Sequence, residues 1–374
     1  MIVLTLQGMS GITAQKDYKG IIYDSKTNET LPYVNIGILN KGVGTVSNEL
    51  GVFHLELNPE DYTTMDTLLI SSMGYKTIKK AVPELEFRYN DYVEIRLLPQ
   101  HMKLSEVVVT DKGTFELNQN VGYQNFGHKT YGYWKDNIAL GGELATKIRV
   151  KKGLRKLNRL FFNVLHNPSD SVLVRVNIYD DDGRMQFPKT NLNTSGRNIL
   201  FPIRSDTEIA LIDLEPFDIF VKNDFIVSLE LLKVYGDKDI GLVLSASENR
   251  STDSYKKYAS QSKWELIGDT AMAYHLNTTL YAKKNRGDSK VRKTIKATKN
   301  QKKISGFVLY AGKPLSDVRI INYSTNERTT TNENGRYEIL AKKGDLLGFE
   351  FQGMKKTVFK ILDRTRINLV MDPV

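Results

Sequence analysis

Four aromatic residues in the middle of the chain have side chains suited to binding sugars. Both tryptophans, Trp134 and Trp264, lie between residues 130 and 282, and Tyr131 and Tyr133 stand beside Trp134. Aromatic faces are suited to packing on the C–H-rich faces of sugar rings, but large aromatic side chains also gather in cores and domain interfaces. A sugar-binding platform at Trp134, Trp264, Tyr131 and Tyr133 is therefore the most specific candidate site, with a core or interface cluster as the alternative.

Catalytic and metal-binding residue types occur without the spacing that such sites need. The sequence has no cysteine, which excludes disulfides, thiolate metal sites and a cysteine nucleophile. The run Asp180–Gly183 could bind Ca²⁺, but Arg184 and Met185 do not fit the ligand pattern of a calcium-binding loop, which favours a solvated turn. Ser254 and Ser260 each begin an S-x-x-K match, yet the S-D-N and K-T-G motifs of penicillin-binding enzymes are missing. We expect no catalytic residue, cofactor or metal.

The positive charge of the chain is concentrated in one segment. Lys283–Lys303 holds ten lysines and arginines and one acidic residue, Asp288, and so carries +9 of the formal net charge of +10. A flexible linker kept soluble by charge repulsion is the simplest interpretation. Docking on an anionic surface, such as lipopolysaccharide or phospholipid headgroups, is the alternative. Nucleic acid is not expected as a partner, because the segment has no aromatic side chain for stacking on bases.

Short strands must position these side chains. Residues 18–99 alternate apolar runs with turn signals at intervals of about 8–12 residues, which is typical of a β-sandwich. Val172–Tyr179 alternates along a strand and ends at the Asp-Gly turn signal of Asp182 and Gly183. The long strands and long excursions of residues 130–282 favour a jelly-roll or galactose-binding-like sandwich. No apolar run reaches the roughly 18 residues of a membrane-spanning helix.

The two ends of the chain share a pattern. Residues 44–53 align with residues 328–337, and both segments contain Asn-Glu-x-Gly with an aromatic residue two positions later. At both ends an aspartate precedes a glycine by eight residues: Asp66 and Gly74, Asp345 and Gly353. Shared landmarks with matched spacing predict two copies of one small domain.

The N-terminal pattern resembles the carboxypeptidase regulatory-like (CarboxypepD_reg-like) domain, a seven-stranded transthyretin-like sandwich. The second copy departs from that pattern, because Tyr310 stands near the expected aspartate and Met354 replaces the tyrosine after Gly353. The residues that carry the resemblance in the first copy are Gly20, Asp24, Pro32, Val34, Ile36, Gly44, Thr45, Asn48, Gly51, Phe53, Asp66, Leu68, Ser71, Gly74 and Tyr75.

The resemblance implies a non-catalytic module of Bacteroidetes-type envelope proteins. In this family the domain follows metallocarboxypeptidase domains or opens TonB-dependent outer-membrane transporters, and Leu104–Thr110 is similar to the stretch that leads into the transporters' plug domain. Neither a metallocarboxypeptidase domain nor a transporter barrel is expected in this chain. No histidine begins an H-x-x-E pair, and the remaining residues, about 260, are far fewer than a large transporter barrel needs.

The expected protein is an exported, all-β chain of the periplasm, outer membrane or cell surface. Met1–Gln15 resembles the back half of a secretory signal peptide. We expect a non-enzymatic binding or scaffold protein of the envelope. The alternatives are a carbohydrate-binding protein in polysaccharide uptake, and a hydrolase with paired carboxylates in the middle domain. The expected order is residues 1–15 partial signal peptide, 16–100 regulatory-like domain, 101–129 connector, 130–282 sandwich, 283–303 basic linker and 304–374 second regulatory-like domain.

Overall fold

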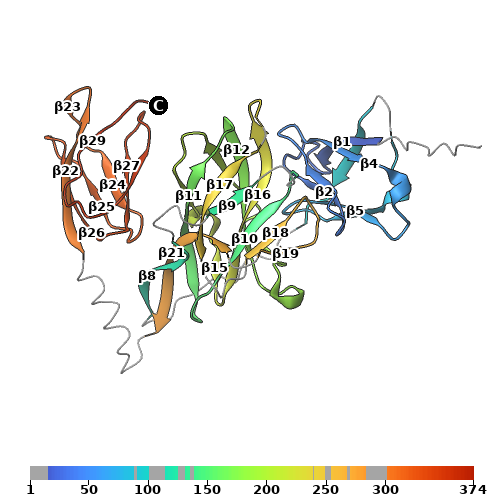
Figure 1. The fold of residues 1–374 in the computed structure, drawn as a ribbon, viewed down its shortest axis with the longest axis horizontal. Coiled ribbons are helices and arrows are strands. Elements are labelled where there is room, and N and C mark those ends of the chain that lie inside the picture. The colour runs from blue at the N-terminus through green and yellow to red at the C-terminus, as the bar shows by residue number, and fades with distance from the viewer. Residues whose placement is uncertain are drawn as a thin grey trace, which may run out of the picture.

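A computed structural model describes residues 16–87, 91–100, 114–124, 131–134, 139–238, 240–248, 254–267, 270–283 and 301–374. The expected signal peptide, residues 1–15, and residues 284–300 of the basic segment lie outside these ranges. Within them every regular element is a β-strand or a short 3-10 helix, so the chain is all-β, as the sequence predicts (Figure 1). The strands form an N-terminal unit (residues 16–100), a middle unit (residues 114–283) and a C-terminal unit (residues 301–374). No described segment is a helix that could span a membrane.

The N-terminal unit is a sandwich of two small sheets with the strand orders β4-β1-β7 and β3-β2-β5-β6. β1 runs antiparallel to β4 and parallel to β7. Alternate residues point between the sheets, so that Ile22, Phe53, Leu68 and Leu97 are buried in one core. The strands are β1 (Lys16–Asp24), β2 (Asn35–Ile38), β3 (Gly44–Val46), β4 (Val52–Leu57), β5 (Thr67–Ser71), β6 (Ile78–Ala81) and β7 (Val93–Leu97), with 3-10 helices at Pro59–Asp61 and Val82–Glu84.

The C-terminal unit repeats this topology. One sheet has the order β23-β22-β26 with β29 parallel to β22, and the other has the order β25-β24-β27-β28. β22, β26 and β29 therefore take the places of β1, β4 and β7. The strands are β22 (Lys302–Tyr310), β23 (Lys313–Pro314), β24 (Arg319–Asn322), β25 (Arg328–Thr330), β26 (Arg336–Ala341), β27 (Leu346–Glu350), β28 (Thr357–Lys360) and β29 (Leu369–Val370).

Side-chain hydrogen bonds recur at matching positions in the two end units. Ser47 Oγ accepts a hydrogen bond from the buried Val34 amide at 2.9 Å and donates to a main-chain carbonyl at 3.0 Å. Thr331 Oγ1 accepts from the Val318 amide at 2.9 Å and donates to the corresponding carbonyl at 2.7 Å. The residue that follows each hydroxyl is an asparagine whose side chain accepts from two amides of its own turn. The two units thus share local chemistry as well as strand order.

The middle unit is a larger sandwich of two sheets. One has the order β13-β12-β16-β10-β18-β19; the other has the order β20-β17-β11-β21-β8, with β14 and β15 also paired to β11 and β9 to β17. The core includes Trp134, Phe162, Val174 and Leu229. The strands are β8 (Thr114–Gly122), β9 (Tyr131–Trp134), β10 (Glu143–Ile148), β11 (Arg155–His166), β12 (Ser171–Tyr179), β13 (Ile199–Arg204), β14 (Ile209–Asp213), β15 (Phe220–Val221), β16 (Phe225–Tyr235), β17 (Leu242–Glu248), β18 (Ser254–Lys257), β19 (Glu265–Leu266), β20 (Thr270–Met272) and β21 (His275–Lys283), with 3-10 helices at Arg184–Gln186 and Glu215–Phe217.

Residues 114–122 differ from the expected connector. They form β8, which pairs antiparallel with the whole of β21 at the edge of the second sheet. The middle unit therefore includes residues that precede the boundary expected at residue 130.

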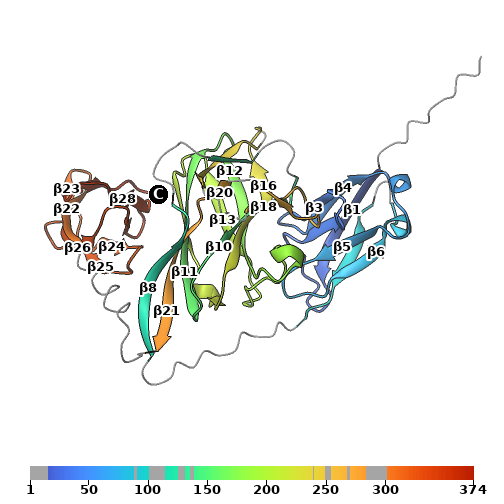
Figure 2. The ribbon, with the colours of Figure 1, turned by 60° about the horizontal axis from the view of Figure 1, so that its bottom comes forward.

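The end units lie on opposite sides of the middle unit in both ribbon views (Figures 1 and 2). Apolar side chains join the C-terminal unit to β11. Phe161 packs with Ile321 and Tyr323, and the ring centroids of Phe161 and Tyr323 are 6.4 Å apart. Arg159 lies over the Tyr323 ring, 5.4 Å from its centroid, and donates a hydrogen bond to Asn326. The N-terminal unit docks on the six-stranded sheet.

His275 is buried beside the contact with the C-terminal unit. It is 8% exposed, and its Nε2 atom lies 2.8 Å from the Gln124 amide nitrogen. Burial, together with the charge of Lys360 in the C-terminal unit, lowers the pKa of His275 to about 4. The ring is therefore neutral near neutral pH, and its Nε2 accepts the hydrogen bond from Gln124.

Acid should weaken the fold through His275. Between about pH 6.5 and pH 4 the unfolded chain binds more protons at this histidine than the folded chain, so the free energy of unfolding falls as the pH decreases through that window. We expect the Tm of the wild-type chain to fall more steeply across the window than that of His275→Phe, by a few degrees. Scanning calorimetry of both proteins at several pH values measures this difference, and equal slopes would contradict it.

Gly335 ends the turn before β26 with a backbone that only glycine adopts easily. Its φ is +66°, and a Cβ there would stand 2.5 Å from the Val308 carbonyl oxygen. Gly335→Ala should destabilise the C-terminal unit by about 2 kcal/mol or more, because left-handed strain and a clash act together. Gly312→Ala is the matched control: its φ is +77°, but nothing lies within 4 Å of the position that a Cβ would take. Urea unfolding of both variants should show the larger loss of unfolding free energy for Gly335→Ala. Equal losses would show that the clash with the Val308 carbonyl makes no contribution.

Candidate functional site

One face of the six-stranded sheet is polar and yet buried. Along β12, Val174 and Val176 face the core, so Arg175 and Asn177 face the other side. Arg175 is 4% exposed and Asn177 is 3% exposed. A polar face of an antiparallel sheet usually faces water. Here the N-terminal unit and the loop after β12 lie against it.

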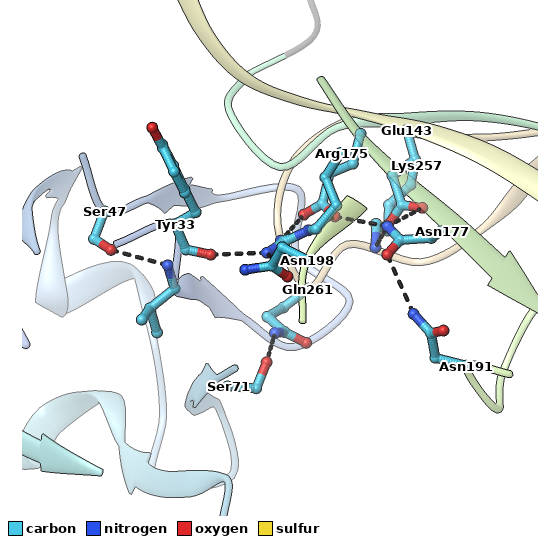
Figure 3. Close-up of polar contacts among 12 residues, drawn as sticks. Tyr33, Ser47, Ser71, Glu143, Arg175, Asn177, Asn191, Asn198, Lys257 and Gln261 are labelled. Atoms are coloured by element: carbon cyan, nitrogen blue, oxygen red, sulfur yellow. Dashed lines mark hydrogen bonds and ion pairs between the residues drawn. The ribbon is translucent and has the colours of Figure 1, made fainter. Parts of the chain in front are cut away.

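A buried ion pair occupies this face. The Nε and Nη2 atoms of Arg175 each donate to one carboxylate oxygen of Glu230 at 2.8 Å, which is bidentate geometry. Burial raises the pKa of Glu230, but the charge and hydrogen bonds of Arg175 outweigh this, so the pKa lies below its usual value and the carboxylate is ionised. Arg175 Nη1 also donates to the main-chain carbonyl of Tyr33 at 2.9 Å, across the boundary between the units (Figure 3).

A second buried carboxylate belongs to the same network. Glu143 of β10 is paired with Lys257 of β18 and accepts a hydrogen bond from the Tyr179 hydroxyl at 3.1 Å. Asn177 Nδ2 donates to Glu230 at 2.7 Å and to Glu143 at 3.4 Å, which links the two ion pairs. Burial and the charge of Glu143 raise the pKa of Tyr179, so its phenol stays protonated and donates.

Both carboxylates of this network are paired with basic side chains. A pair of catalytic carboxyl groups needs separated pKa values and freedom to exchange protons with a substrate. Glu230 is held by Arg175, and Glu143 is held by Lys257. Among the described residues, no group of three or more His, Asp or Glu side chains could hold a metal ion. The arrangement is suited to holding two units in register.

A cleft of about 730 Å³ opens between the N-terminal and middle units, beside the ion pair. We call it the interdomain cleft. Ser71 to Tyr75 of the N-terminal unit line one wall, and residues 189–198 of the loop after β12 contribute Lys189, Asn191 and Asn198 to the other. Arg175 and Glu230 also line it. Its volume lies in the range of small-molecule sites.

Glu49 makes a second polar contact between these units. It accepts a hydrogen bond from Lys233 Nζ at 2.8 Å and another from the Tyr235 hydroxyl at 2.7 Å. The hydrogen bond from Lys233 lowers the pKa of Glu49 to about 2. Val46, Leu173 and Leu232 form a small buried cluster alongside.

Two glycines allow close backbone contact at the same boundary. A Cβ atom on Gly37 or on Gly44 would stand 2.3 Å from the Ser260 carbonyl oxygen of the middle unit. The next residue, Gln261, donates to Ser71 Oγ at 2.8 Å (Figure 3). The docking surface therefore requires the absence of a side chain at both positions.

The structure does not bring the sequence-predicted aromatic residues together as a platform. Trp134 is 0% exposed in the core of the middle unit, so it has no face for a sugar. Trp264 is partly buried elsewhere, on the outer face of the six-stranded sheet, where its ring packs edge-on against Tyr179 with centroids 6.0 Å apart. Tyr131 and Tyr133 lie in β9, opposite β17. Trp134 is a core residue because β9 directs it between the two sheets.

The other residues considered from sequence have local roles. Asp181 pairs with the buried Lys147 of β10 at 2.6 Å, and Asp182 accepts from the Thr190 hydroxyl at 2.7 Å, so both carboxylates have partners within the protein. The Ser254 and Ser260 hydroxyls are buried without a hydrogen-bond partner among the described residues, so no base activates either of them there.

Sequence reasoning missed the charged network. Its signal is a charged residue within an apolar strand, as in Val174-Arg175-Val176 and Leu229-Glu230-Leu231. Such a pattern reads as a solvent face, because alternation tells which residues share a face but not what covers it. Tyr33 of the covering unit, which accepts a hydrogen bond from Arg175, lies 142 residues before it in the sequence.

Residues 18–109 match the family of the CarboxypepD_reg-like domain. The match covers the N-terminal unit and less than half of the chain. It confirms the domain that the sequence motifs indicated. The chain is similar in sequence to no curated protein.

Solved structures of surface proteins and a virus align only loosely. The major pilin subunit BcpA of Bacillus cereus is 8% identical, with 96% of this chain and 98% of the pilin covered and a TM-score of 0.16. The T6 backbone pilin of Streptococcus pyogenes serotype M6 is 9% identical over 93% of this chain and 80% of the pilin, with a TM-score of 0.14. The infectious bursal disease virus Gx strain structure is 12% identical over 76% and 74%, with a TM-score of 0.23. Likenesses at such TM-scores support no functional conclusion.

Removing one partner of the buried ion pair should cost much of the stability of the fold. Arg175→Met leaves the Glu230 carboxylate buried without its cation, which we expect to cost about 3–5 kcal/mol in urea unfolding. Arg175→Met combined with Glu230→Leu should be far milder, because no charge is left behind. Lys233→Met is the control: it breaks a more exposed pair with Glu49 and should cost about 1 kcal/mol or less. Similar losses of unfolding free energy for Arg175→Met and Lys233→Met would contradict the conclusion that Arg175 and Glu230 form a buried ion pair.

Proposed function

We propose that this chain is a non-enzymatic scaffold or binding protein of the cell envelope. In it, a middle β-sandwich is held between two CarboxypepD_reg-like domains. The family match supports the first of these domains. The shared strand order and the matching hydroxyl bonds of Ser47 and Thr331 support a second copy in the C-terminal unit.

The observation that carries the scaffold role is the reach of Arg175 out of its buried ion pair to the Tyr33 carbonyl at 2.9 Å. The Arg175 side chain is buried, and one of its N–H donors is satisfied by a carbonyl of the N-terminal unit. Moving that unit would leave this donor without a partner beside a charge that must stay paired, so the contact fixes the position of the unit. Together with the close approach of Gly37 to Ser260, it favours three units that behave as one elongated body. A fixed spacing between two similar end domains suits a scaffold.

The sequence supports the proposed export of the chain and the proposed classes of partner. The apolar stretch Met1–Gln15 and the occurrence of the domain family in envelope proteins support export. Lys283–Lys303, with its concentrated positive charge, is suited to an anionic surface such as lipopolysaccharide or phospholipid headgroups. An envelope protein or a glycan is the partner class that this location favours.

Adding a single methyl group to Gly37 should separate the N-terminal unit from the middle unit. The three atoms nearest to a Cβ at Gly37 all belong to the middle unit, with the Ser260 carbonyl oxygen at 2.3 Å. We expect Gly37→Ala to increase the radius of gyration in small-angle X-ray scattering and to produce a separate melting transition for the N-terminal unit.

The control for this experiment is Gly42→Ala in the neighbouring turn. Nothing lies within 4 Å of a Cβ at Gly42, although its φ is +74°, so this variant should lose some stability and keep the wild-type scattering profile. The scaffold proposal is wrong if the scattering of the wild-type chain can be explained only by units that move independently. It is also wrong if the scattering profile of Gly37→Ala is identical to that of the wild type.

A further inference from the structure

The interdomain cleft is polar but has little net charge to offer a ligand. Arg175 uses four of its five N–H groups: two bind Glu230, one binds the Tyr33 carbonyl and one binds Asn198 Oδ1. Glu230 is neutralised by the same guanidinium. Lys189 is the remaining charged side chain among the described lining residues. An anionic ligand would find Lys189 as the one cation of the described lining beyond the ion pair.

Amide and hydroxyl side chains make up most of the remaining lining, and the network fixes how two of them are turned. Asn198 Oδ1 accepts from Arg175 at 3.3 Å, which leaves the amide nitrogen of Asn198 to donate. Asn191 Nδ2 donates to Asn177 Oδ1 at 3.2 Å, and Asn191 Oδ1 accepts from the Asn193 amide at 2.9 Å, so this side chain is held at both ends (Figure 3). The cleft therefore offers the Asn198 amide nitrogen as a donor of set orientation, on a wall that the Asn191 side chain helps to hold in place.

Both walls are held in shape without a ligand. In the loop after β12, Asn193 donates to the Arg197 carbonyl at 2.8 Å and accepts from the Ser195 hydroxyl at 2.7 Å. On the N-terminal wall, the Tyr75 hydroxyl donates to Asp24 at 2.8 Å. Groups that are fixed before binding lose less conformational entropy on binding.

We propose that the interdomain cleft binds an uncharged, hydroxyl-rich ligand of the oligosaccharide class. A sugar hydroxyl both donates and accepts, as do the amides and hydroxyls that line the cleft. Met73 and the Tyr75 ring add apolar surface for the C–H face of a sugar. This site lies apart from Trp134 and goes beyond the scaffold role, because its walls come from two units that the scaffold keeps together.

The test is binding of the full chain to an array of neutral hexasaccharides of glucose, mannose, xylose and galactose, with uronic acid hexasaccharides alongside. We expect at least one neutral probe to bind with an affinity that does not change between about 0.15 M and 0.5 M salt, since little net charge is involved. Asn198→Ala should weaken that binding about three- to tenfold through loss of the hydrogen bond that its amide nitrogen donates. Ser72→Trp should abolish it by filling the cleft.

The matched control is Asn334→Ala, which removes an exposed asparagine side chain from a turn of the C-terminal unit and should leave binding unchanged. Binding to no neutral probe, or binding that survives Ser72→Trp, would overturn the proposal. Salt-sensitive binding to the uronic acids alone would also overturn it and would point to Lys283–Lys303. Scattering profiles of the wild type and Ser72→Trp distinguish failure of the ligand proposal from failure of the scaffold proposal. A chain that binds no ligand but scatters as one rigid body contradicts ligand binding and leaves the scaffold role intact.

Discussion

Two opposite charges lie on the face of β12 and β16 that points away from the core, and the docking of the N-terminal unit depends on keeping them paired. Taking Arg175 and Glu230 out of water is costly, and their bidentate contact at 2.8 Å offsets this cost only while every other polar group nearby is satisfied. Tyr33 supplies the missing acceptor from another unit. Such a pair contributes less to net stability than to specifying one arrangement, since any displaced position of the N-terminal unit would leave a buried donor without a partner.

The two end units use the same sheet to meet the middle unit but use different chemistry. By strand register, Gly37 of β2 corresponds to Ile321 of β24, and both lie at a contact with the middle unit. Gly37 brings backbone against the Ser260 carbonyl, whereas Ile321 places an apolar side chain against Phe161 of β11. At this position one contact is made by backbone and the other by side chains, and Arg159 and Asn277 also donate hydrogen bonds to the C-terminal unit. A single domain topology has thus been adapted to two different surfaces of the middle unit.

The sequence predicts local elements better than it predicts what covers them. Alternation in Val172–Tyr179 correctly indicates a strand with Val174 and Val176 buried, and the turn landmarks correctly indicate the regulatory-like domain at the N-terminus. β8 escapes prediction because Thr114–Gly122 carries mostly polar residues at an edge. Trp134 suggests a binding face but lies in the core, because a short strand opposite β17 directs it inward. The cleft and the ion-pair network arise from contacts between distant segments, which no local pattern records.

The serial arrangement of the three units has a mechanical consequence (Figure 2). A pull applied to the two ends of the body passes through both contacts in turn, so the weaker contact sets the load at which the body parts. Both contacts combine hydrogen bonds with apolar packing. Glu49 lies beside the cluster of Val46, Leu173 and Leu232, and Arg159 lies beside the packed rings of Phe161 and Tyr323. The interdomain cleft lies at the first of these contacts, so a load that separates the N-terminal unit also separates the two walls of the cleft.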